Sequence, residues 1–507
     1  MAADTFQKVI TEKAKRYGEQ VLMRCARTGK TLTYRQLAEQ VAATAEELLG
    51  HGLRQGSKVL LVMENSVEFA LSFFGITQFG GIAVPVNTML KEAELEYLIK
   101  DSEAAAVFLS EEFLKYIPKP YREKQIRLKN GRILLLISAE TAKKDWPENE
   151  DSAYVQEPED VAMMLYTSGT TGHPKGVILS YRNLLSKAEH IRKAHLLTER
   201  DTVLCVLPWF HINGLVITLI TPLASDGKIV IGGKFSVTNF WDDVEKYHIT
   251  WFSGVPTMYS HLLSRGIPED KDKSSLRFAR SASSPLPVAV LEEFERRCGV
   301  PIIESYGITE GASQITTNPM PPKTCKPGSV GLPFGNEIRI VDGQMQDLPA
   351  GALGEVLIKG DNITRGYYRK PEETEKSFSG EWFHSGDLGY LDGDGYLYLD
   401  GRIKELINRA GEKFSPREVD EVLYRLEGVE LAATVGVPDE VYGEEVAAFI
   451  VRKNDSLTEN MVKDWCQAHL AAYKVPRKVF FIEDLPKGGN GKIQRLKLID
   501  IYKKGMV

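Results

Sequence analysis

The chain has 507 residues, of which 43% are hydrophobic and 26% charged. This length exceeds what one hydrophobic core usually supports, so we expect at least two folded units. Lys and Arg number 63 against 69 Asp and Glu, which gives a formal net charge of −6. A mildly acidic chain has no overall field that attracts phosphates, and this argues against nucleic acid as the main partner.

Cysteine, histidine and apolar patterns exclude further classes. The five cysteines are scattered without CxxC spacing, which favours reduced packing residues over a disulfide framework or a zinc site. The nine histidines lack HxxxH and HExxH spacing, so we do not expect a protein-built transition-metal centre. No signal-like segment and no apolar run long enough to span a bilayer is found. We therefore expect a cytoplasmic protein without a transmembrane segment.

Helical and strand-like patterns alternate along the first part of the chain. The predicted elements are a helix at 33–50, a strand at 58–63, a helix at 66–79, a strand at 81–86, a helix at 92–100 and a strand at 104–109. A similar alternation continues to about residue 303. This pitch is typical of βαβ units, so we expect parallel-rich sheets covered by helices.

The pattern then changes twice. Short strand-like runs with glycine turns between 349 and 399, including Asp392-Gly-Asp-Gly395, predict a small β-rich subdomain at about 330–400. A new helix at 416–426, strands at 432–437 and 447–451 and a helix at 457–470 follow. We expect an α/β fold with a large N-terminal domain over 1–401, which includes that subdomain, and a small α+β C-terminal domain over 402–507.

The most informative local motif is Tyr166-Thr-Ser-Gly-Thr-Thr-Gly-His-Pro-Lys-Gly176, directly after a strand-like run at 161–165. Glycines let backbone N–H groups converge on an oxyanion, hydroxyls add donors and a lysine neutralises charge, so this composition suits a phosphate cradle. The GxxxxGK[ST] spacing of a Walker A loop is absent. On composition alone, a flexible glycine-rich surface loop stays the alternative.

The full motif resembles the signature loop of the adenylate-forming superfamily, which contains acyl- and aryl-CoA synthetases, insect luciferases and the adenylation domains of peptide synthetases. The other signatures follow in the family's order: Pro208-Trp-Phe-His-Ile-Asn-Gly-Leu215, Glu304-Ser-Tyr-Gly-Ile-Thr-Glu310, Ser385-Gly-Asp-Leu-Gly389, Gly401-Arg-Ile-Lys-Glu405, Arg409-Ala-Gly-Glu-Lys-Phe-Ser-Pro416 and Pro486-Lys-Gly-Gly-Asn-Gly-Lys492. The resemblance implies an enzyme that activates a carboxylic acid with ATP as an acyl-adenylate, releases pyrophosphate, and transfers the acyl group to coenzyme A.

The resemblance also implies the nucleotide contacts. Tyr306, followed by Gly307, matches the aromatic plate on adenine, and Thr309 matches the hydroxyl that holds the α-phosphate. Asp387 matches the carboxylate that accepts hydrogen bonds from both ribose hydroxyls, and Arg402 matches a ribose and phosphate contact. Without this context, Tyr306 would more often be a core residue and Asp387 a turn cap.

The phosphates and the metal involve further positions. Glu310 matches the ligand of Mg²⁺, a hard cation that needs oxygen donors beside the triphosphate. Taken alone, Glu310 would more often be a surface charge. The cradle itself consists of Thr167, Ser168, Gly169, Thr170, Thr171, Gly172 and Lys175.

Lys492 is the expected catalytic residue of the first half-reaction. The acid's carboxylate and the α-phosphate repel each other, and a lysine that bridges them offsets this repulsion and stabilises the transition state. Asn490 stands where the family most often has serine. The resemblance further implies that the C-terminal domain is mobile and rotates about Lys404 after adenylation, which withdraws Lys492 and presents the loop around Gly411 to the pantetheine of coenzyme A.

The acid itself is less determined. His211 occupies the position that lines the acyl site in CoA ligases, and amino-acid-activating domains usually have aspartate there, so an amino acid is disfavoured. Positions that form the acyl pocket of plant aryl-CoA ligases are occupied by Asn213, Ile217, Arg280, Ser283 and Ser305. The run Arg280-Ser-Ala-Ser-Ser-Pro-Leu286 is similar to the oxalyl-CoA synthetase branch. A short polar acid and a medium or long fatty acid both remain open.

Arg280 has two physically reasonable arrangements. It points into the pocket and pairs with a polar end of the acid, or it turns outward and pairs with an acidic side chain of the protein, because an unpaired buried charge is costly. We expect the outward arrangement.

Other functions stay open at this point. One alternative is a stand-alone adenylation enzyme that loads the pantetheine of a carrier protein. A luciferase-type oxygenase and a non-catalytic binding module are two more, and the complete set of Thr309, Glu310, Asp387 and Lys492 argues against the second. The sequence is compatible with a monomer or a homodimer.

Overall fold

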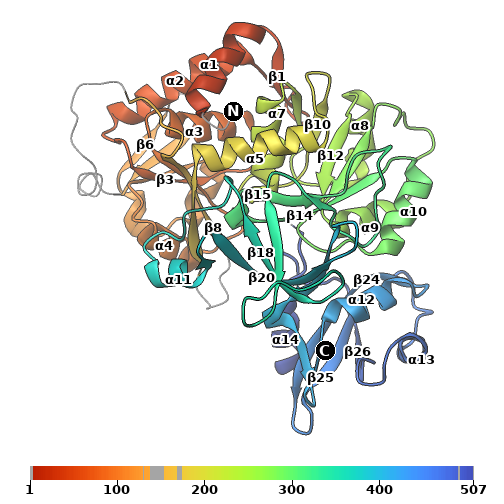
Figure 1. The fold of residues 1–507 in the computed structure, drawn as a ribbon. Coiled ribbons are helices and arrows are strands. Elements are labelled where there is room, and N and C mark those ends of the chain that lie inside the picture. The colour runs from red at the N-terminus through yellow and green to blue at the C-terminus, as the bar shows by residue number, and fades with distance from the viewer. Residues whose placement is uncertain (1–3, 129–130, 138–153, 168–173, 489–490, 506–507) are drawn as a thin grey trace.

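The structure, a computed structural model, describes residues 4–128, 131–137, 154–167, 174–488 and 491–505. A large part is formed by the first four-fifths of the chain, and a smaller C-terminal part lies beneath it (Figure 1). Four sheets organise the described residues. None of the helices in these ranges is long and apolar enough to cross a membrane.

The first sheet has seven strands in the order β6-β7-β5-β3-β4-β8-β9. Its central strands β5, β3, β4 and β8 are parallel, and antiparallel strands close both edges. The bounds are β3 (Lys58–Val62), β4 (Ile82–Pro85), β5 (Ala106–Leu109), β6 (Gln125–Arg127), β7 (Ile133–Leu136), β8 (Val161–Thr167) and β9 (Lys175–Ser180). The predicted phosphate loop falls in the sequence between β8 and β9, and residues 168–173 of it lie outside the described residues.

The second sheet has nine strands in the order β16-β15-β14-β13-β12-β10-β11-β1-β2, and its parallel run from β1 to β14 ends in an antiparallel pair. The bounds are β1 (Val21–Cys25), β2 (Thr31–Thr33), β10 (Thr202–Cys205), β11 (Lys228–Ile231), β12 (Trp251–Gly254), β13 (Phe278–Ser281), β14 (Ile302–Ile308), β15 (Ser313–Thr317) and β16 (Leu332–Pro333). The carboxyl ends of parallel strands in such sheets are the usual place for ligands.

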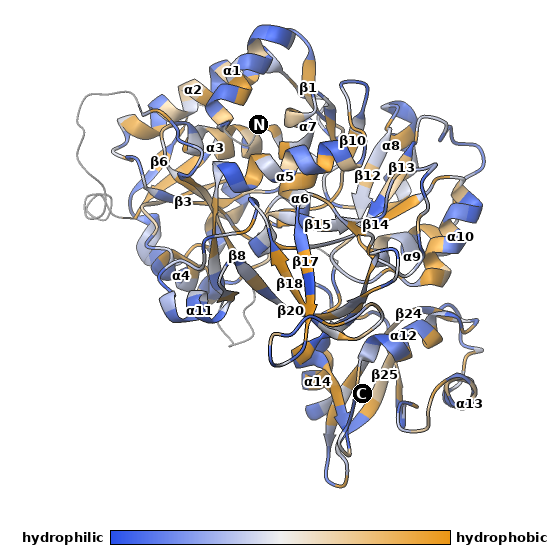
Figure 2. Cartoon of the chain, viewed as in Figure 1, coloured by the Kyte–Doolittle hydropathy of each residue, from blue (hydrophilic) through white to orange (hydrophobic). Residues whose placement is uncertain are grey.

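Helices cover these two sheets. The larger ones are α1 (Phe6–Tyr17), α2 (Tyr34–Gly50), α3 (Val67–Gln78), α4 (Glu92–Asp101), α5 (Tyr181–Ala194), α8 (Val237–Lys246), α9 (Pro256–Arg265) and α10 (Val288–Cys298), and the short ones are α6 (Ile212–Leu215), α7 (Thr221–Ala224) and α11 (Pro371–Lys376). In Figure 2, helices at the rim such as α2 and α10 carry both hydrophilic and hydrophobic stretches. Amphipathic helices of this kind bury one stripe on a sheet.

The helix α2 shows why the local sequence specifies these elements. The Thr33 side chain accepts a hydrogen bond from the Gln36 backbone at 3.2 Å, and the Gln36 side chain accepts one from Thr33 at 3.0 Å. This capping box satisfies N–H groups that the first helical turn leaves unpaired. Leu37, Val41 and Leu48 form the buried stripe.

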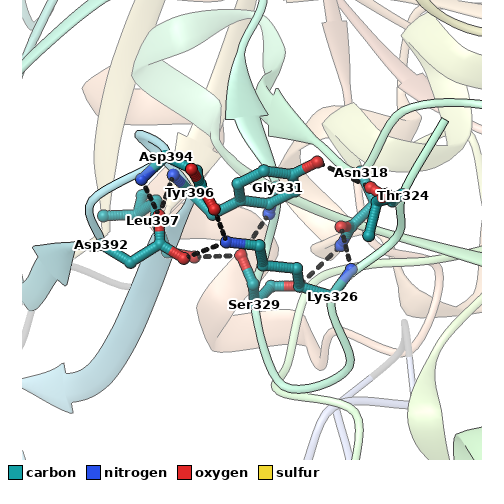
Figure 3. Close-up of polar contacts among 9 residues, drawn as sticks. All are labelled: Asn318, Thr324, Lys326, Ser329, Gly331, Asp392, Asp394, Tyr396 and Leu397. Carbon is teal, nitrogen blue, oxygen red and sulfur yellow. Dashed lines mark hydrogen bonds and ion pairs between the residues drawn. The ribbon is translucent and has the colours of Figure 1, made fainter.

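A third, antiparallel sheet forms the predicted β-rich subdomain in the order β17-β18-β20-β19, with β21 on β20. The bounds are β17 (Glu337–Val341), β18 (Gly354–Lys359), β19 (Phe378–Ser379), β20 (Trp382–Leu391) and β21 (Leu397–Arg402). Figure 3 shows how the loop that leads into it is fixed: Lys326 Nζ donates to Asp392 at 2.6 Å and to Asp394 at 2.7 Å, in the turn between β20 and β21.

The C-terminal part packs helices on a sheet of order β23-β22-β25-β24, with β26 parallel to β25. The bounds are β22 (Ile407–Arg409), β23 (Glu412–Phe414), β24 (Val429–Asp439), β25 (Gly443–Arg452), β26 (Lys478–Phe481), α12 (Pro416–Tyr424), α13 (Glu459–His469) and α14 (Arg495–Lys503). The predicted fold class is therefore confirmed. The division at residues 401 and 402 stays a prediction, and β21 runs across it.

Candidate active site

A cavity lies between the edge of the nine-stranded sheet, the β-rich subdomain and the C-terminal part. Thr257 of α9 donates to the Gly491 carbonyl at 3.1 Å, and the Val288 amide donates to Glu421 of α12 at 3.4 Å, so both sides of the cavity are in direct contact. Seven of the predicted site residues line it: Ser283, Ser305, Tyr306, Gly307, Asp387, Arg402 and Lys492.

At one end of the cavity, Tyr306, Asp387 and Arg402 form a connected group. The Tyr306 hydroxyl donates to Asp387 Oδ2 at 2.5 Å, and Arg402 Nε lies 3.1 Å from Asp387 Oδ1. The register of β20 and β21 places Asp387 directly opposite Arg402. Burial, followed by the charge of Asp387, raises the pKa of Tyr306, so its hydroxyl keeps its proton and acts as a donor.

At this end of the cavity, the backbone of β15 passes so close to position 307 that only glycine fits there. β14 and β15 shift register between Tyr306 and Gly307, and a Cβ at Gly307 would lie 1.9 Å from the Ser313 carbonyl oxygen. A larger residue would push β15 away. The absence of a side chain at Gly307 therefore allows the close approach of β15 at this shift.

Lys492 reaches the cavity from the C-terminal part. The Gly488 amide donates to the Lys492 carbonyl at 2.7 Å and the Gln494 amide donates to the Pro486 carbonyl at 2.8 Å, which holds the segment that contains Lys492 against residues 486–488. Burial lowers the pKa of Lys492, and the nearby Arg402 cation lowers it further, whereas Glu405 and Asp387 oppose the change. The ammonium group is thus placed among the residues predicted to hold the nucleotide.

Two of the residues predicted to hold phosphate and metal, Lys175 and Glu310, lie beside Tyr367. Its hydroxyl donates to Glu310 Oε1 at 2.9 Å, and Lys175 Nζ lies 5.1 Å from the centre of its ring. Thr167 is the register partner of Lys175 in the β8–β9 pair. Thr309 begins the short 3₁₀ turn η5 (Thr309–Gly311) that carries Glu310. The other predicted loop residues, Ser168, Gly169, Thr170, Thr171 and Gly172, lie outside the described residues, as does Asn490.

The residues predicted to form the acyl site lie in and around α6, on β14 and in the segment after β13. His211 is the N-cap of α6, and burial lowers its pKa to about 4, so the ring is neutral at pH 7. Asn213 donates to the Ser283 hydroxyl at 3.0 Å, and Ser283 has a positive φ of 75°. The Ser305 hydroxyl lies 2.9 Å from that of Thr317. Hydroxyl and amide groups therefore surround this end.

The expected outward arrangement of Arg280 is wrong. Its side chain is 1% exposed, and it donates through Nη1 to Asn213 Oδ1 at 2.8 Å and to Ser253 Oγ at 3.1 Å, and through Nε to Gln314 Oε1 at 3.3 Å. All three partners are neutral. No acidic side chain of the described residues forms an ion pair with it, and its side chain is buried rather than turned toward the surface.

Ten predicted residues of the described part of the chain do not line the cavity: Thr167, Lys175, His211, Asn213, Ile217, Arg280, Thr309, Glu310, Lys404 and Gly411. Ile217 is fully buried in the main hydrophobic core. Gly411 lies in the turn between β22 and β23, where its φ of 92° requires glycine-like freedom. Lys404 is the middle residue of the 3₁₀ turn η6 (Ile403–Glu405), immediately after β21. Their predicted roles stay predictions.

Comparison with known proteins is consistent with this geometry. A model of the AMP-binding enzyme family matches residues 10–368, and a model of the AMP-binding enzyme C-terminal domain matches residues 418–492. The chain belongs to the AMP-binding enzyme family. The predicted assignment to the acyl-CoA synthetase branch of the adenylate-forming superfamily is thereby confirmed.

Curated relatives and solved structures agree with this membership. The AMP-binding enzyme is 38% identical to an oxalate–CoA ligase of Arabidopsis thaliana and 35% identical to a sulfoacetate–CoA ligase of Cupriavidus necator, and each alignment covers 98% of both chains. The crystal structure of ATP-bound MatB from Rhodopseudomonas palustris has a TM-score of 0.87 and 30% identity, over 99% of this chain and 100% of that one. The predicted AMP-forming acid–thiol ligase is therefore confirmed as the enzyme class, and ATP as its nucleotide.

Several site residues of this AMP-binding enzyme were not predicted. Ser253 and Gln314 hold Arg280, and Tyr367 joins Glu310 to Lys175. Gln314 lies only four residues after the motif that ends at Glu310, and its register partner is Gly307. The pairing of Gln314 with Gly307 could have indicated that Gln314 lies near the site, but this pairing depends on a register shift that the sequence does not reveal.

Proposed function

We propose that the enzyme is an AMP-forming CoA ligase for a short acid that carries a second anionic group. The observation that carries the proposal is the buried Arg280 with three neutral partners. Burial lowers the pKa of Arg280 to about 9, so the guanidinium is still charged at pH 7. An unpaired buried cation is costly, and an anionic ligand group relieves that cost.

A hydrocarbon tail fits this arrangement poorly. Asn213 accepts a hydrogen bond from Arg280 and donates one to Ser283, which lines the cavity, so a single amide lies between the guanidinium and the cavity wall. The tail of a fatty acid would leave that charge unpaired in an apolar environment. The names of two relatives support the proposal, because oxalate and sulfoacetate both carry a second anionic group beside the reacting carboxylate.

For the nucleotide, we propose the roles that the resemblance implies. The Asp387 oxygens, now bound by Tyr306 and Arg402, would accept hydrogen bonds from the ribose hydroxyls, and the Tyr306 ring would pack against adenine. Lys492 would bridge the acid's carboxylate and the α-phosphate, and the Thr309 hydroxyl would donate to that phosphate. Attack of the carboxylate oxygen on the α-phosphorus then releases pyrophosphate and leaves the acyl-adenylate.

Mg²⁺ fits Glu310. A carboxylate held by one neutral hydroxyl, that of Tyr367, retains oxygen lone pairs for a hard cation. No group of three or more metal-ligating side chains occurs among residues the structure describes, which suits an ion that takes most of its ligands from phosphates and water. When bound, the cation would neutralise phosphate charge.

Coenzyme A is the proposed acceptor, since both curated relatives are named CoA ligases. We further propose that the C-terminal domain, residues 402–507, rotates about Lys404 and brings the Gly411 turn toward the pantetheine. The thiol sulfur would then attack the acyl carbon and expel AMP, which leaves a thioester. We retain the cytoplasm as the proposed location.

Pyrophosphate release with oxalate, malonate, hexanoate and dodecanoate, with and without coenzyme A, tests the proposal. We expect oxalate or malonate to have the highest kcat/KM, and Arg280→Met to lower that value about 10- to 100-fold, because hydrogen bonds to charged groups are worth about 1.5–3 kcal/mol. Arg277→Met is a matched control, because this nearby arginine pairs with Asp201. A wild type that prefers dodecanoate would contradict the proposal.

A further inference from the structure

A buried lysine on α5 has only neutral hydrogen-bond partners. Lys187 is 0% exposed, and its Nζ donates to Asn336 Oδ1 at 2.8 Å and lies 3.5 Å from the Phe334 carbonyl oxygen. Among the residues that the structure describes, no Asp or Glu forms an ion pair with it. Burying a cation among neutral groups is costly, so a lysine at this position requires an explanation.

Lysine can avoid part of this cost by releasing its proton. Burial lowers the pKa of Lys187 to about 7, so the ammonium and the amine are both populated at neutral pH. Each form has an N–H bond to donate to Asn336. The constant property of Lys187 is therefore a donor aimed at Asn336, whereas its charge varies with pH.

From Asn336, side-chain amides lead to the turn that carries Glu310. Asn336 Nδ2 donates to Asn362 Oδ1 at 2.8 Å, and Asn362 Nδ2 donates to the Gly311 carbonyl at 2.6 Å. Gly311 is the last residue of η5. We call this series, from Lys187 through the two asparagines to Gly311, the amide chain.

The direction of the amide chain is fixed at its far end. The Gly311 carbonyl can only accept, so the atom of Asn362 that faces it must be the nitrogen. The oxygen of Asn362 then faces Asn336, which must present its own nitrogen there and its oxygen to Lys187. Only a donor at position 187 completes this arrangement. An apolar side chain at that position would leave the Asn336 oxygen without this hydrogen bond.

The two asparagines pack closely over Gly360. A Cβ at this position would lie 2.4 Å from Asn336 Nδ2 and 2.9 Å from Asn362 Oδ1, so both amides lie directly against the Gly360 backbone. Asn362 is also 0% exposed. The amide chain therefore has little room to rearrange when one of its hydrogen bonds is lost.

The helix α5 holds the same loop at a second point. Asn183 lies one helical turn before Lys187 and donates through Nδ2 to the carbonyls of Asp361 and Ile363, at 2.8 Å and 3.0 Å. Residues one turn apart lie on one face of a helix. One face of α5 thus fixes the loop that contains Asn362.

This loop in turn fixes the backbone of η5 at two successive residues. The Thr364 amide donates to the Glu310 carbonyl at 2.7 Å, and Asn362 donates to the Gly311 carbonyl. Thr309 and Glu310, the residues proposed to hold the α-phosphate and Mg²⁺, belong to this turn. A shift of the Gly311 carbonyl would therefore move groups that are proposed to contact the nucleotide and its metal.

We propose that Lys187 is a positioning residue for adenylation, which holds η5 through the amide chain so that Thr309 and Glu310 meet the α-phosphate and Mg²⁺. The proposal rests on the proposed function, because the roles of those two residues come from it. Lys187 is not among the residues that line the cavity, so it acts through the turn. A turn that is held in place before ATP binds needs no reorganisation in the transition state.

The test uses the full chain and measures kcat/KM for ATP, the KM for the acid that the wild type uses best, and the thermal midpoint. Lys187→Met should lower kcat/KM for ATP about tenfold, because the loss of one buried hydrogen bond releases the turn. The KM for the acid should hardly change, since the amide chain ends at the phosphate side. Lys187→Gln keeps a side-chain N–H and should recover part of the loss.

Arg132→Met is the matched control. Arg132 is 2% exposed and is also a buried cation that donates to neutral side chains, to Ser72 Oγ at 2.9 Å and to Thr44 Oγ1 at 3.4 Å. These partners belong to α3 and α2, which contain no predicted site residue. Its loss should lower the thermal midpoint as Lys187→Met does, but should leave kcat/KM for ATP unchanged.

Asn336→Asp separates positioning from stability. The new carboxylate would form an ion pair with Lys187, but it could not donate to Asn362. Asn362 would then face this carboxylate with its own oxygen, or turn and place that oxygen against the Gly311 carbonyl. We expect a thermal midpoint close to that of the wild type, because the ion pair offsets the lost hydrogen bond, and about a tenfold lower kcat/KM for ATP.

The outcomes separate this inference from the proposed function. If Lys187→Met and Asn336→Asp lower kcat/KM for ATP no more than Arg132→Met does, the positioning role of Lys187 is wrong. Should Lys187→Met not fold, Asn336→Asp and Lys187→Gln decide the question. If Glu310→Gln leaves kcat/KM for ATP unchanged, the proposed function of the turn itself fails. A large effect of Glu310→Gln beside an unaffected Lys187→Met rejects only the role of Lys187.

Discussion

The two proposed ends of the active site differ in whether their charged side chains are paired with an opposite charge. At the nucleotide end, Asp387 and Arg402 pair with each other and Tyr306 donates to the same carboxylate. At the acyl end, the Arg280 guanidinium has only neutral partners within the described chain. The nucleotide end is complete without a ligand, whereas the acyl end lacks one negative charge. On the proposed roles, binding at the first end would depend on geometry, and binding at the second would depend on the charge of the acid.

Lys492 joins the two ends, and its removal should have the largest effect. Lys492→Ala should slow acyl-adenylate formation by about two to four orders of magnitude, because it removes the cation that bridges two anions in the transition state. Pyrophosphate release in a single turnover measures this step. Thioester formation from supplied acyl-adenylate should survive. A variant equally impaired in both half-reactions would mean that Lys492 does not act only in adenylation.

The second prediction concerns Lys404, in the turn after β21, where a substitution should affect the two half-reactions differently. Lys404→Pro should keep most of the adenylation rate and lose most of the transfer to coenzyme A. A proline suits the φ of a 3₁₀ turn but cannot adopt the other dihedral angles that rotation demands. The preceding Ile403 is then biased away from helical angles, so a modest loss in adenylation is also expected. Lys404→Gly is the matched control and should retain both steps; normal transfer in Lys404→Pro would contradict rotation about this residue.

Much of the fold and of the candidate site could be predicted from the sequence. The rest could not, because it depends on contacts between strands that are far apart in the chain. The helix at 33–50 and the strand at 58–63 match α2 and β3 within one residue, because capping and hydrophobic periodicity are local signals. Tyr306, Asp387 and Lys492 line one cavity, as their motifs implied. The burial of Arg280 and its contacts with Ser253 and Gln314 depend on how β12, β13, β14 and β15 are arranged in the sheet, which no local pattern encodes.

A third prediction applies to the nucleotide end. Asp387→Asn should raise the KM for ATP about 10- to 100-fold, since hydrogen bonds to a charged group are worth about 1.5–3 kcal/mol and Arg402 also loses its partner. The preference among acids should not change, because the acyl end contains none of these groups. Steady-state kinetics with varied ATP and two acids measures both quantities. A shift in acid preference as large as the loss in ATP affinity would show that the two ends are not independent.

The last and smallest effect concerns Glu304 of β14, the strand that pairs with β13. Its register partner on β13 is Ser281, the neighbour of Arg280, so Glu304 lies on the opposite face of the sheet from Arg280. It is 1% exposed, its Oε1 accepts from the Leu286 amide at 3.0 Å, and its Oε2 is buried without a partner in the described ranges. Burial raises the pKa of Glu304 to about 7, from 4.5, although the charge of Arg417 opposes the change.

The sign of the pH effect follows from proton binding. Between pH 4.5 and 7 the folded protein holds the Glu304 proton that the unfolded chain has already released, so stability falls as pH rises through this window. Glu304→Gln should therefore be more stable than the wild type at pH 8, by on the order of 3 kcal/mol at most, and lose the advantage near pH 4.5. Thermal midpoints at both pH values measure this, with Glu292→Gln on the exposed side of α10 as the control. An equal difference at both pH values would mean that Glu304 is ionised in the folded enzyme, and the acyl half would then contain a buried anion as well as a buried cation.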